Sequence, residues 1–87
     1  MAYEVRLKPA ALRDLKRLPK DARRRAFQKI ESLAAVPRPP GARKLQTAGD
    51  LYRVRVGDYR ILYEVQDGER RVMVARVRDR KDAYRDF

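Results

Sequence analysis

The chain has 87 residues, with 23 lysines and arginines against 12 aspartates and glutamates, and a formal net charge of +11. That length suits one small domain, which we expect to span residues 1–87. The chain contains no cysteine and no histidine, which excludes disulfides, thiolate zinc sites, thiol nucleophiles and imidazole acid-base chemistry. The excess of basic residues favours a polyanionic partner, and we therefore expect a nucleic acid-binding domain.

A strand and a helix are expected in the N-terminal part of the chain. Residues 2–7 alternate apolar and charged side chains, which is the period of a half-buried strand. Residues 8–18 have leucines at helical spacing, a proline suited to the first turn, and Pro19 directly after the last. The apolar stripe of this helix consists of Leu12, Leu15 and Leu18.

A second helix is expected over residues 20–36, where apolar residues again recur at helical spacing. Its apolar face consists of Ala22, Ala26, Phe27, Ile30, Leu33 and Ala34. Residues 37–44 contain three prolines, which remove backbone donors and fix φ. The sequence therefore predicts a helical hairpin followed by an extended linker.

From Leu51 onward the hydrophobic period changes to two, which indicates strands. Strands are expected over residues 51–56, 59–65 and 69–77. With the N-terminal strand they make a mainly antiparallel four-stranded sheet, on which the helical hairpin packs. The predicted fold class is α+β, with a short helical segment at the C-terminal end.

Two turns decide which side chains of this meander share a face. A two-residue first loop at Gly57-Asp58 predicts the pairs Val56–Tyr59, Arg55–Arg60 and Arg53–Leu62. A three-residue second loop over residues 66–68, with Gly68 left-handed, predicts the pairs Val65–Glu69, Ile61–Met73 and Tyr59–Ala75. A two-residue second loop would turn Arg76 toward the core and is rejected for that reason.

These pairs divide the meander into an apolar face and a cationic face. The apolar face, which should pack against the helices, consists of Tyr52, Val54, Val56, Tyr59, Ile61, Tyr63, Val65, Met73, Ala75 and Val77. The opposite face, which should remain uncovered, consists of Arg53, Arg55, Arg60, Leu62, Val72, Val74, Arg76 and Arg78. Because like charges directly opposite each other destabilise a sheet, the arginines suggest a phosphate-binding surface.

The element order and two sequence stretches resemble the RelE/ParE toxin superfamily, and most of all its RelE branch. The stretches are LYRVRVGDYRILYEV at 51–65 and VRDRKDAY at 77–84. The resemblance implies a type II toxin-antitoxin toxin that acts as a ribosome-dependent endoribonuclease, or mRNA interferase. Such a toxin cleaves mRNA in the A site by attack of a ribose 2′-hydroxyl on the adjacent phosphate, without a metal or other cofactor, and inhibits translation.

By this resemblance the catalytic residues are Arg53, Arg55, Arg60, Arg80 and Tyr84. The first three would stabilise charge on the phosphorane, Tyr84 would accept the 2′-hydroxyl proton, and Arg80 would assist the leaving group. At the positions of Arg53 and Arg55, lysine is familiar in the family. The spacing from Arg80 to Tyr84 is shorter than in the best-known members, so Arg78 is an alternative to Arg80 as the residue that assists the leaving group. Further RNA or phosphate contacts are expected from Arg76, Arg78, Lys81, Arg23 and Arg24.

The resemblance also implies partners. A cognate, RelB-like antitoxin with an acidic, amphipathic segment is expected to contact three apolar residues among the arginines, namely Leu62, Val72 and Val74. The other partners would be mRNA and ribosomal RNA in the A site. No apolar run approaches the ~20 residues of a membrane span and no signal-peptide pattern is present, so a cytoplasmic location without membrane contact is expected.

Two other functions compete with the nuclease. A ParE-like, non-nuclease inhibitor of DNA gyrase would need neither Tyr84 nor the three arginines of the hairpin. A plain RNA-binding module would need exposed stacking aromatics on the sheet, as single-strand binders have. That reading is disfavoured, because the expected core face contains Tyr52, Tyr59 and Tyr63.

Overall fold

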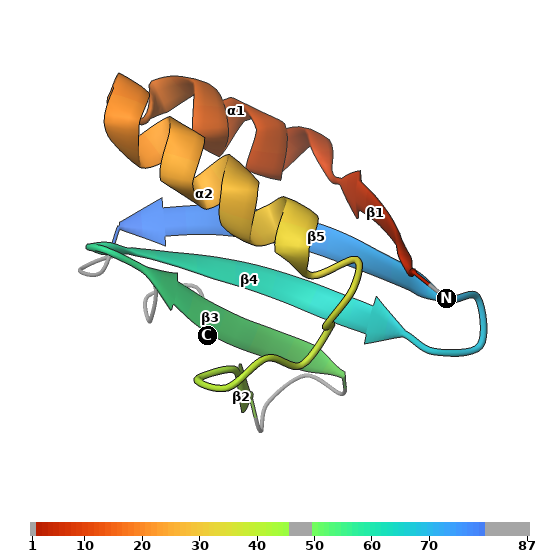
Figure 1. Ribbon diagram of the computed structural model, residues 1–87. Coiled ribbons are helices and arrows are strands. Elements are labelled where there is room, and N and C mark those ends of the chain that lie inside the picture. The colour runs from red at the N-terminus through yellow and green to blue at the C-terminus, as the bar shows by residue number, and fades with distance from the viewer. Residues whose placement is uncertain (1, 46–49, 80–87) are drawn as a thin grey trace.

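Two helices cover one face of a five-stranded sheet in the computed structural model, which describes residues 2–45 and 50–79 (Figure 1). The elements are β1 (Glu4–Leu7), α1 (Pro9–Arg17), α2 (Lys20–Ser32), β2 (Arg43–Lys44), β3 (Leu51–Val56), β4 (Tyr59–Gln66) and β5 (Arg71–Asp79). The strand order is β1-β5-β4-β3-β2, with β1 parallel to β5 and the other neighbours antiparallel. The predicted α+β fold is confirmed, while the predicted C-terminal helical segment lies outside the described residues.

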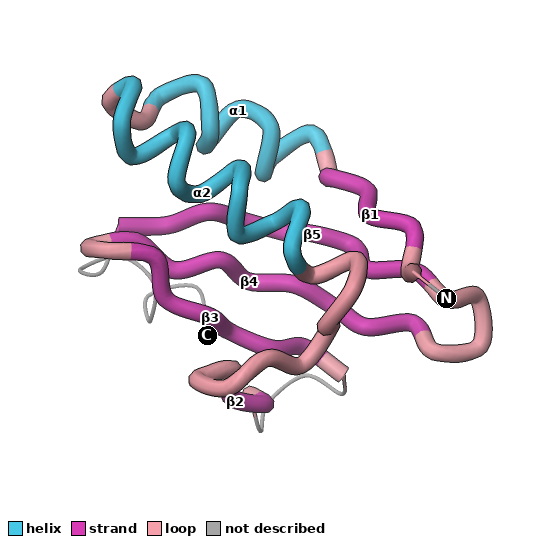
Figure 2. Tube along the Cα trace, in the orientation of Figure 1, coloured by secondary structure: helices cyan, strands magenta, loops and turns pink. Residues whose placement is uncertain are grey.

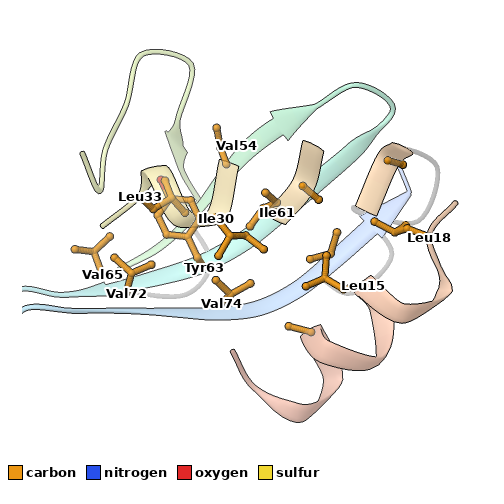
Figure 3. Close-up of a cluster of buried hydrophobic side chains, with 14 residues drawn as sticks. Leu15, Leu18, Ile30, Leu33, Val54, Ile61, Tyr63, Val65, Val72 and Val74 are labelled. Carbon is orange, nitrogen blue, oxygen red and sulfur yellow. The ribbon is translucent and has the colours of Figure 1, made fainter. Parts of the chain in front are cut away.

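The core lies between the helices and the sheet. Figure 3 shows Ile30 of α2 and Leu33, directly after α2, packed against Ile61, Tyr63 and other strand residues there. Two residues placed on the apolar helix faces are largely outside this core, since Leu12 is 47% exposed and Phe27 is 49% exposed. Each directly follows a fully buried alanine. Because successive residues are rotated by about 100° around a helix, a residue next to the centre of the buried face lies at the boundary with solvent. Neither described helix is long and apolar enough to cross a membrane.

A short fifth strand, β2, forms the last two residues of segment 37–44, which the sequence predicts to be only a linker (Figure 2). Arg43 and Lys44 pair with Arg53 and Tyr52 at the outer edge of β3. Arg38 anchors the preceding segment, because it donates to Asp67 at 2.7 Å and to the Tyr52 hydroxyl at 2.9 Å. The linker is therefore fixed against the end of the sheet that lies opposite the β3–β4 turn.

The predicted β3–β4 register is confirmed, but the predicted β4–β5 register is wrong. The second turn has four residues, 67–70, and Arg70 rather than Gly68 has a left-handed backbone, with φ of 52°. The register also shifts within the pair, leaving Ala75 between the pairs Tyr63–Val74 and Leu62–Arg76. The buried side chains of β5 are Val72, Val74 and Val77. Because of the bulge, the buried positions change from even-numbered to odd-numbered residues along the strand.

Candidate functional site

An arginine cluster occupies the face of the sheet that points away from the helices. Arg55 of β3, Arg60 of β4 and Arg78 of β5 lie directly opposite one another and form one row across three strands. Arg53 stands two residues along β3, opposite Leu62. We refer to Arg53, Arg55, Arg60 and Arg78 as the arginine cluster. Guanidinium groups gathered in this way suit an anionic ligand, because each can donate charge-assisted hydrogen bonds to phosphate oxygens.

The corrected β4–β5 register is what brings Arg78 into the row. In the predicted register Tyr59, the first residue of β4, pairs with Ala75, so that Arg78 would have no partner on β4. The four-residue turn and the bulge instead place Arg78 opposite Arg60. The row that contains Arg53 also gains Arg43 from β2, which sequence reasoning missed because the segment around it reads as a linker. The structure thus adds Arg43 to the arginines predicted on this face, whereas Arg76, which was also predicted there, is bound by Asp14.

The prediction that the cationic face is uncovered is wrong on its central strand. Arg60 is 3% exposed and Leu62 is 1% exposed, although both alternate with core residues of β4. Long side chains from the neighbouring strands flank both positions, since β3 and β5 carry arginines opposite them. Val72 and Val74, predicted on the same face, lie in the core instead. Leu62, Val72 and Val74 therefore do not form an exposed patch for an antitoxin.

The β3–β4 turn forms a small polar cleft beside the cluster. Gly57 has φ of +58°, a conformation that a tight two-residue turn requires and that glycine adopts without a steric penalty. The cleft has a volume of about 30 Å³, enough for a water molecule or one phosphate oxygen, and is lined by Arg55, Gly57, Asp58, Tyr59 and Arg60. The turn thus places two guanidinium groups beside a site of the size of one oxygen atom.

Arg25 of α2 also reaches this turn, and no sequence pattern indicated it. Its guanidinium atoms lie 3.5–3.7 Å from the position that a Cβ at Gly57 would occupy. The contact arises because α2 packs on the sheet through small residues, Ala22 and Ala26, which brings its backbone close. The helical layer therefore contributes one more cation next to the cleft.

Arg76 is held outside the cluster by Asp14 of α1. Its Nε and Nη2 donate to the two Asp14 carboxylate oxygens at 2.8 and 3.2 Å, and the Val77 backbone N–H donates to the same carboxylate at 3.0 Å. Burial raises the pKa of Asp14, but the hydrogen bonds from Arg76 and Val77 outweigh it and hold that pKa below its usual range. The guanidinium predicted to bind RNA thus fixes α1 to β5.

Of the other predicted RNA contacts, Arg78 belongs to the arginine cluster, whereas Arg23 and Arg24 do not. Arg23 and Arg24 lie on α2, on the covered side of the sheet; Arg23 donates to the Leu18 carbonyl and Arg24 lies 3.6 Å from Asp21. Arg80, Lys81 and Tyr84 lie outside the described residues. Of the predicted catalytic residues, the structure therefore brings together Arg53, Arg55 and Arg60.

The fold and the sequence place the chain in a known family. The family whose description reads "ParE toxin of type II toxin-antitoxin system, parDE" matches residues 5–84. The chain belongs to this toxin family. The toxin is 30% identical over 88 residues to a protein of Methanocaldococcus jannaschii provisionally named toxin RelE1, with 98% of both chains covered.

Solved structures extend this similarity to RelE toxins. The toxin matches a chain of the archaeal RelE-RelB complex from Pyrococcus horikoshii OT3 with 32% identity and a TM-score of 0.82, covering 95% of this chain and 100% of that chain. A chain of the RelBE2 complex of Mycobacterium tuberculosis matches with 28% identity and a TM-score of 0.82, covering 92% of this chain and 100% of that chain. A chain of the intact RelBE complex of E. coli matches with 26% identity and a TM-score of 0.79, covering 90% of this chain and 96% of that chain. The predicted membership of the RelE/ParE superfamily, with a RelE-like fold, is confirmed.

Proposed function

We propose that this toxin is a ribosome-dependent endoribonuclease that cleaves mRNA in the A site and so inhibits translation. The observation that carries the proposal is the row formed by Arg55, Arg60 and Arg78 on adjacent strands, with Arg53 beside it. Fixed guanidinium groups suit a phosphoryl transfer, because negative charge spreads over the phosphorane oxygens in the transition state. Similarity to several RelE toxins supports the same reading.

The proposed reaction is transesterification within the RNA. The ribose 2′-oxygen attacks the adjacent phosphorus, the bond from phosphorus to the 5′-oxygen breaks, and the products are a 2′,3′-cyclic phosphate and a 5′-hydroxyl. The phenolate of Tyr84 takes the 2′-hydroxyl proton. Arg78, which stands opposite Arg60, stabilises the departing 5′-oxygen, with Arg80 as the alternative residue for this role. The 5′-oxygen takes up a proton from water to give the 5′-hydroxyl, and Tyr84 releases the 2′-hydroxyl proton to solvent. No step requires a metal ion.

The ribosome supplies what the toxin lacks. Guanidinium groups stay protonated near neutral pH, so Arg53 and Arg55 cannot act as general bases. A weak catalyst of this kind depends on a substrate held in line, and a codon fixed in the A site meets that need. The net charge of +11, with Arg23 and Arg24 on α2, provides contacts to ribosomal RNA outside the cluster.

An antitoxin partner is part of the same proposal. The solved RelE-RelB and RelBE relatives are complexes of a toxin with its antitoxin. A RelB-like antitoxin with an acidic segment would neutralise the cationic surface of this toxin and compete with RNA for it. Neutralisation of toxicity by coexpression of such an antitoxin is the expected behaviour in cells.

Inhibition of DNA gyrase is a second candidate, favoured by the match to the ParE family. The two functions separate in one pair of assays with purified toxin. In a translation extract, the nuclease should produce message cuts that map to A-site codons. With purified gyrase and supercoiled DNA, the inhibitor should instead accumulate cleavage complexes while the message stays intact. Intact message in the first assay would overturn the nuclease proposal.

A further inference from the structure

A larger cavity adjoins the cleft at the β3–β4 turn. It has a volume of about 270 Å³ and lies where the C-terminal end of α1 meets the ends of β4 and β5; its lining consists of Asp14, Arg17, Leu18, Tyr59, Arg76, Val77, Arg78 and Asp79. Tyr59 belongs to the lining of both cavities, and Arg78 in the larger one stands opposite Arg60 in the smaller one. The two cavities are therefore neighbours at the end of the arginine row.

The larger cavity combines the groups that a nucleobase needs. Leu18, Val77 and the partly buried Tyr59 supply apolar surface and an aromatic ring. Arg17 is exposed at the end of α1 and offers hydrogen-bond donors at the rim. The volume lies just under the range of about 300–1,000 Å³ that is usual for drug-sized ligands, so a single nucleotide unit is the appropriate size.

We propose that this cavity binds the base of a ribonucleotide whose phosphate lies in the arginine cluster, that Tyr59 holds the base by stacking, and that Arg17 determines the base preference. The inference rests on the proposed ribonuclease function and adds a base-binding subsite to it. Tyr59 stacks on the base between the two cavities, while Arg17 donates to its edge. Tyr59 was placed on the core face by its sequence position; the structure leaves part of it facing the two cavities.

Nucleotide binding by the toxin alone tests the subsite without a ribosome. The probes are the four ribonucleoside 5′-monophosphates, with ribose 5-phosphate as the probe that lacks a base, followed by backbone amide NMR signals. Nucleotides should shift the signals of Leu18, Tyr59 and Val77 and bind more tightly than ribose 5-phosphate. Equal affinity and equal shifts for ribose 5-phosphate would overturn the proposal.

Substitutions then assign the contacts. Tyr59→Leu should weaken nucleotide binding by about 5-fold to 150-fold through loss of base stacking, whereas Tyr59→Phe keeps the ring and should bind within about twofold of wild type. Arg17→Ala, at an exposed position, tests the subsite without disturbing the core. Lys16→Ala is the matched control, because it removes the same charge from the same turn outside the cavity lining. Equal losses in Arg17→Ala and Lys16→Ala would contradict the assigned role of Arg17.

Mapping of cut sites on ribosomes separates this proposal from the nuclease proposal. Arg17→Ala should change the distribution of bases at the cut sites, while Lys16→Ala should keep the wild-type distribution. A wild-type toxin that cuts, with an unchanged distribution in Arg17→Ala, would refute the subsite alone. A wild-type toxin that does not cut would refute the nuclease, and the nucleotide titration would then still decide whether the cavity binds a base.

Discussion

Replacement of Asp14 should weaken the contact between α1 and the C-terminal part of β5. β1 pairs with β5 only as far as Val74, and beyond that point the Asp14 carboxylate accepts the Val77 N–H at 3.0 Å. Asp14→Ala leaves that buried donor without its acceptor, which costs about 1–3 kcal/mol. The ion pair with Arg76 adds roughly 1 kcal/mol or less, because about a third of the Arg76 side chain is exposed.

The expected loss of unfolding free energy for Asp14→Ala is therefore about 1–4 kcal/mol. In a domain of this size that loss corresponds to a decrease in Tm of roughly 4–30 °C. Asp14→Asn keeps an oxygen for the Val77 N–H and should lose about 1 kcal/mol. Urea denaturation and thermal unfolding measure both variants, with Asp21→Asn as an exposed control that should stay within about 0.5 kcal/mol of wild type. A loss below about 0.5 kcal/mol in Asp14→Ala would refute the reasoning.

The same carboxylate gives a pH dependence of defined sign. The pKa of Asp14 is lower in the folded protein than its usual value, so its contribution to stability is complete above about pH 4. That contribution is lost as the pH falls through the folded pKa. Asp14→Asn should therefore lose less unfolding free energy than wild type as the pH falls below about 4. Parallel losses in the two proteins would mean that Asp14 does not contribute in this way.

Four further predictions concern the site and its surroundings. Arg60→Ala should reduce ribosome-dependent cleavage by about 10²-fold or more at an equal yield of folded protein, and equal toxicity would contradict its role. Gly57→Ala should lower the unfolding free energy by about 1–2 kcal/mol because of its positive φ, while Gly68→Ala should not. Tyr84→Phe should lower single-turnover cleavage by about 10²-fold to 10⁴-fold, and an unchanged rate with a native melting profile would exclude a proton-transfer role. The logarithm of ribosome affinity should fall linearly with the logarithm of salt concentration, and a flat response would mean that the basic residues are merely solvated.

The part of the fold that the sequence predicts best is the β3–β4 hairpin. Alternation of apolar and charged residues on both sides of a two-residue turn leaves one register that keeps the apolar set on one face. The pairs Arg55–Arg60 and Arg53–Leu62 follow from that constraint and are observed. Three of the predicted catalytic residues could therefore be brought together from sequence alone.

The last strand shows why the rest could not be predicted. Gly68 suggested a short turn, but Arg70 adopts the left-handed conformation, which its residue type does not signal. The register shift beside Ala75 changes which parity faces the core, and a simple period of two cannot represent it. In a strand without a bulge, Val72 and Val74 could enter the core only if Arg76 did as well. The register shift removes this condition, and Val72, Val74 and Val77 are all buried.

Contacts between distant parts of the chain were also beyond the sequence. The pairing of Asp14 with Arg76 joins residues that are 62 positions apart, and the contact of Arg25 with Gly57 depends on how closely α2 approaches the sheet. Neither residue type nor spacing specifies such a distance. The cavity next to Tyr59 exists only because these layers are docked, so the sequence predicted most of the arginine cluster but not this cavity.

Single-turnover cleavage of a defined message on programmed ribosomes tests the central claim most directly. The message is prepared in two forms, one all-ribose and one with a single 2′-deoxynucleotide immediately 5′ to the cleaved phosphate, and both are incubated with toxin in the presence of a chelator that leaves the ribosomes intact. The account predicts cutting of the all-ribose message in the A-site codon, with a 2′,3′-cyclic phosphate on the upstream fragment, and no cutting at that bond in the deoxy form. Equal cutting of both forms, or equal cutting of the message without ribosomes, would contradict it.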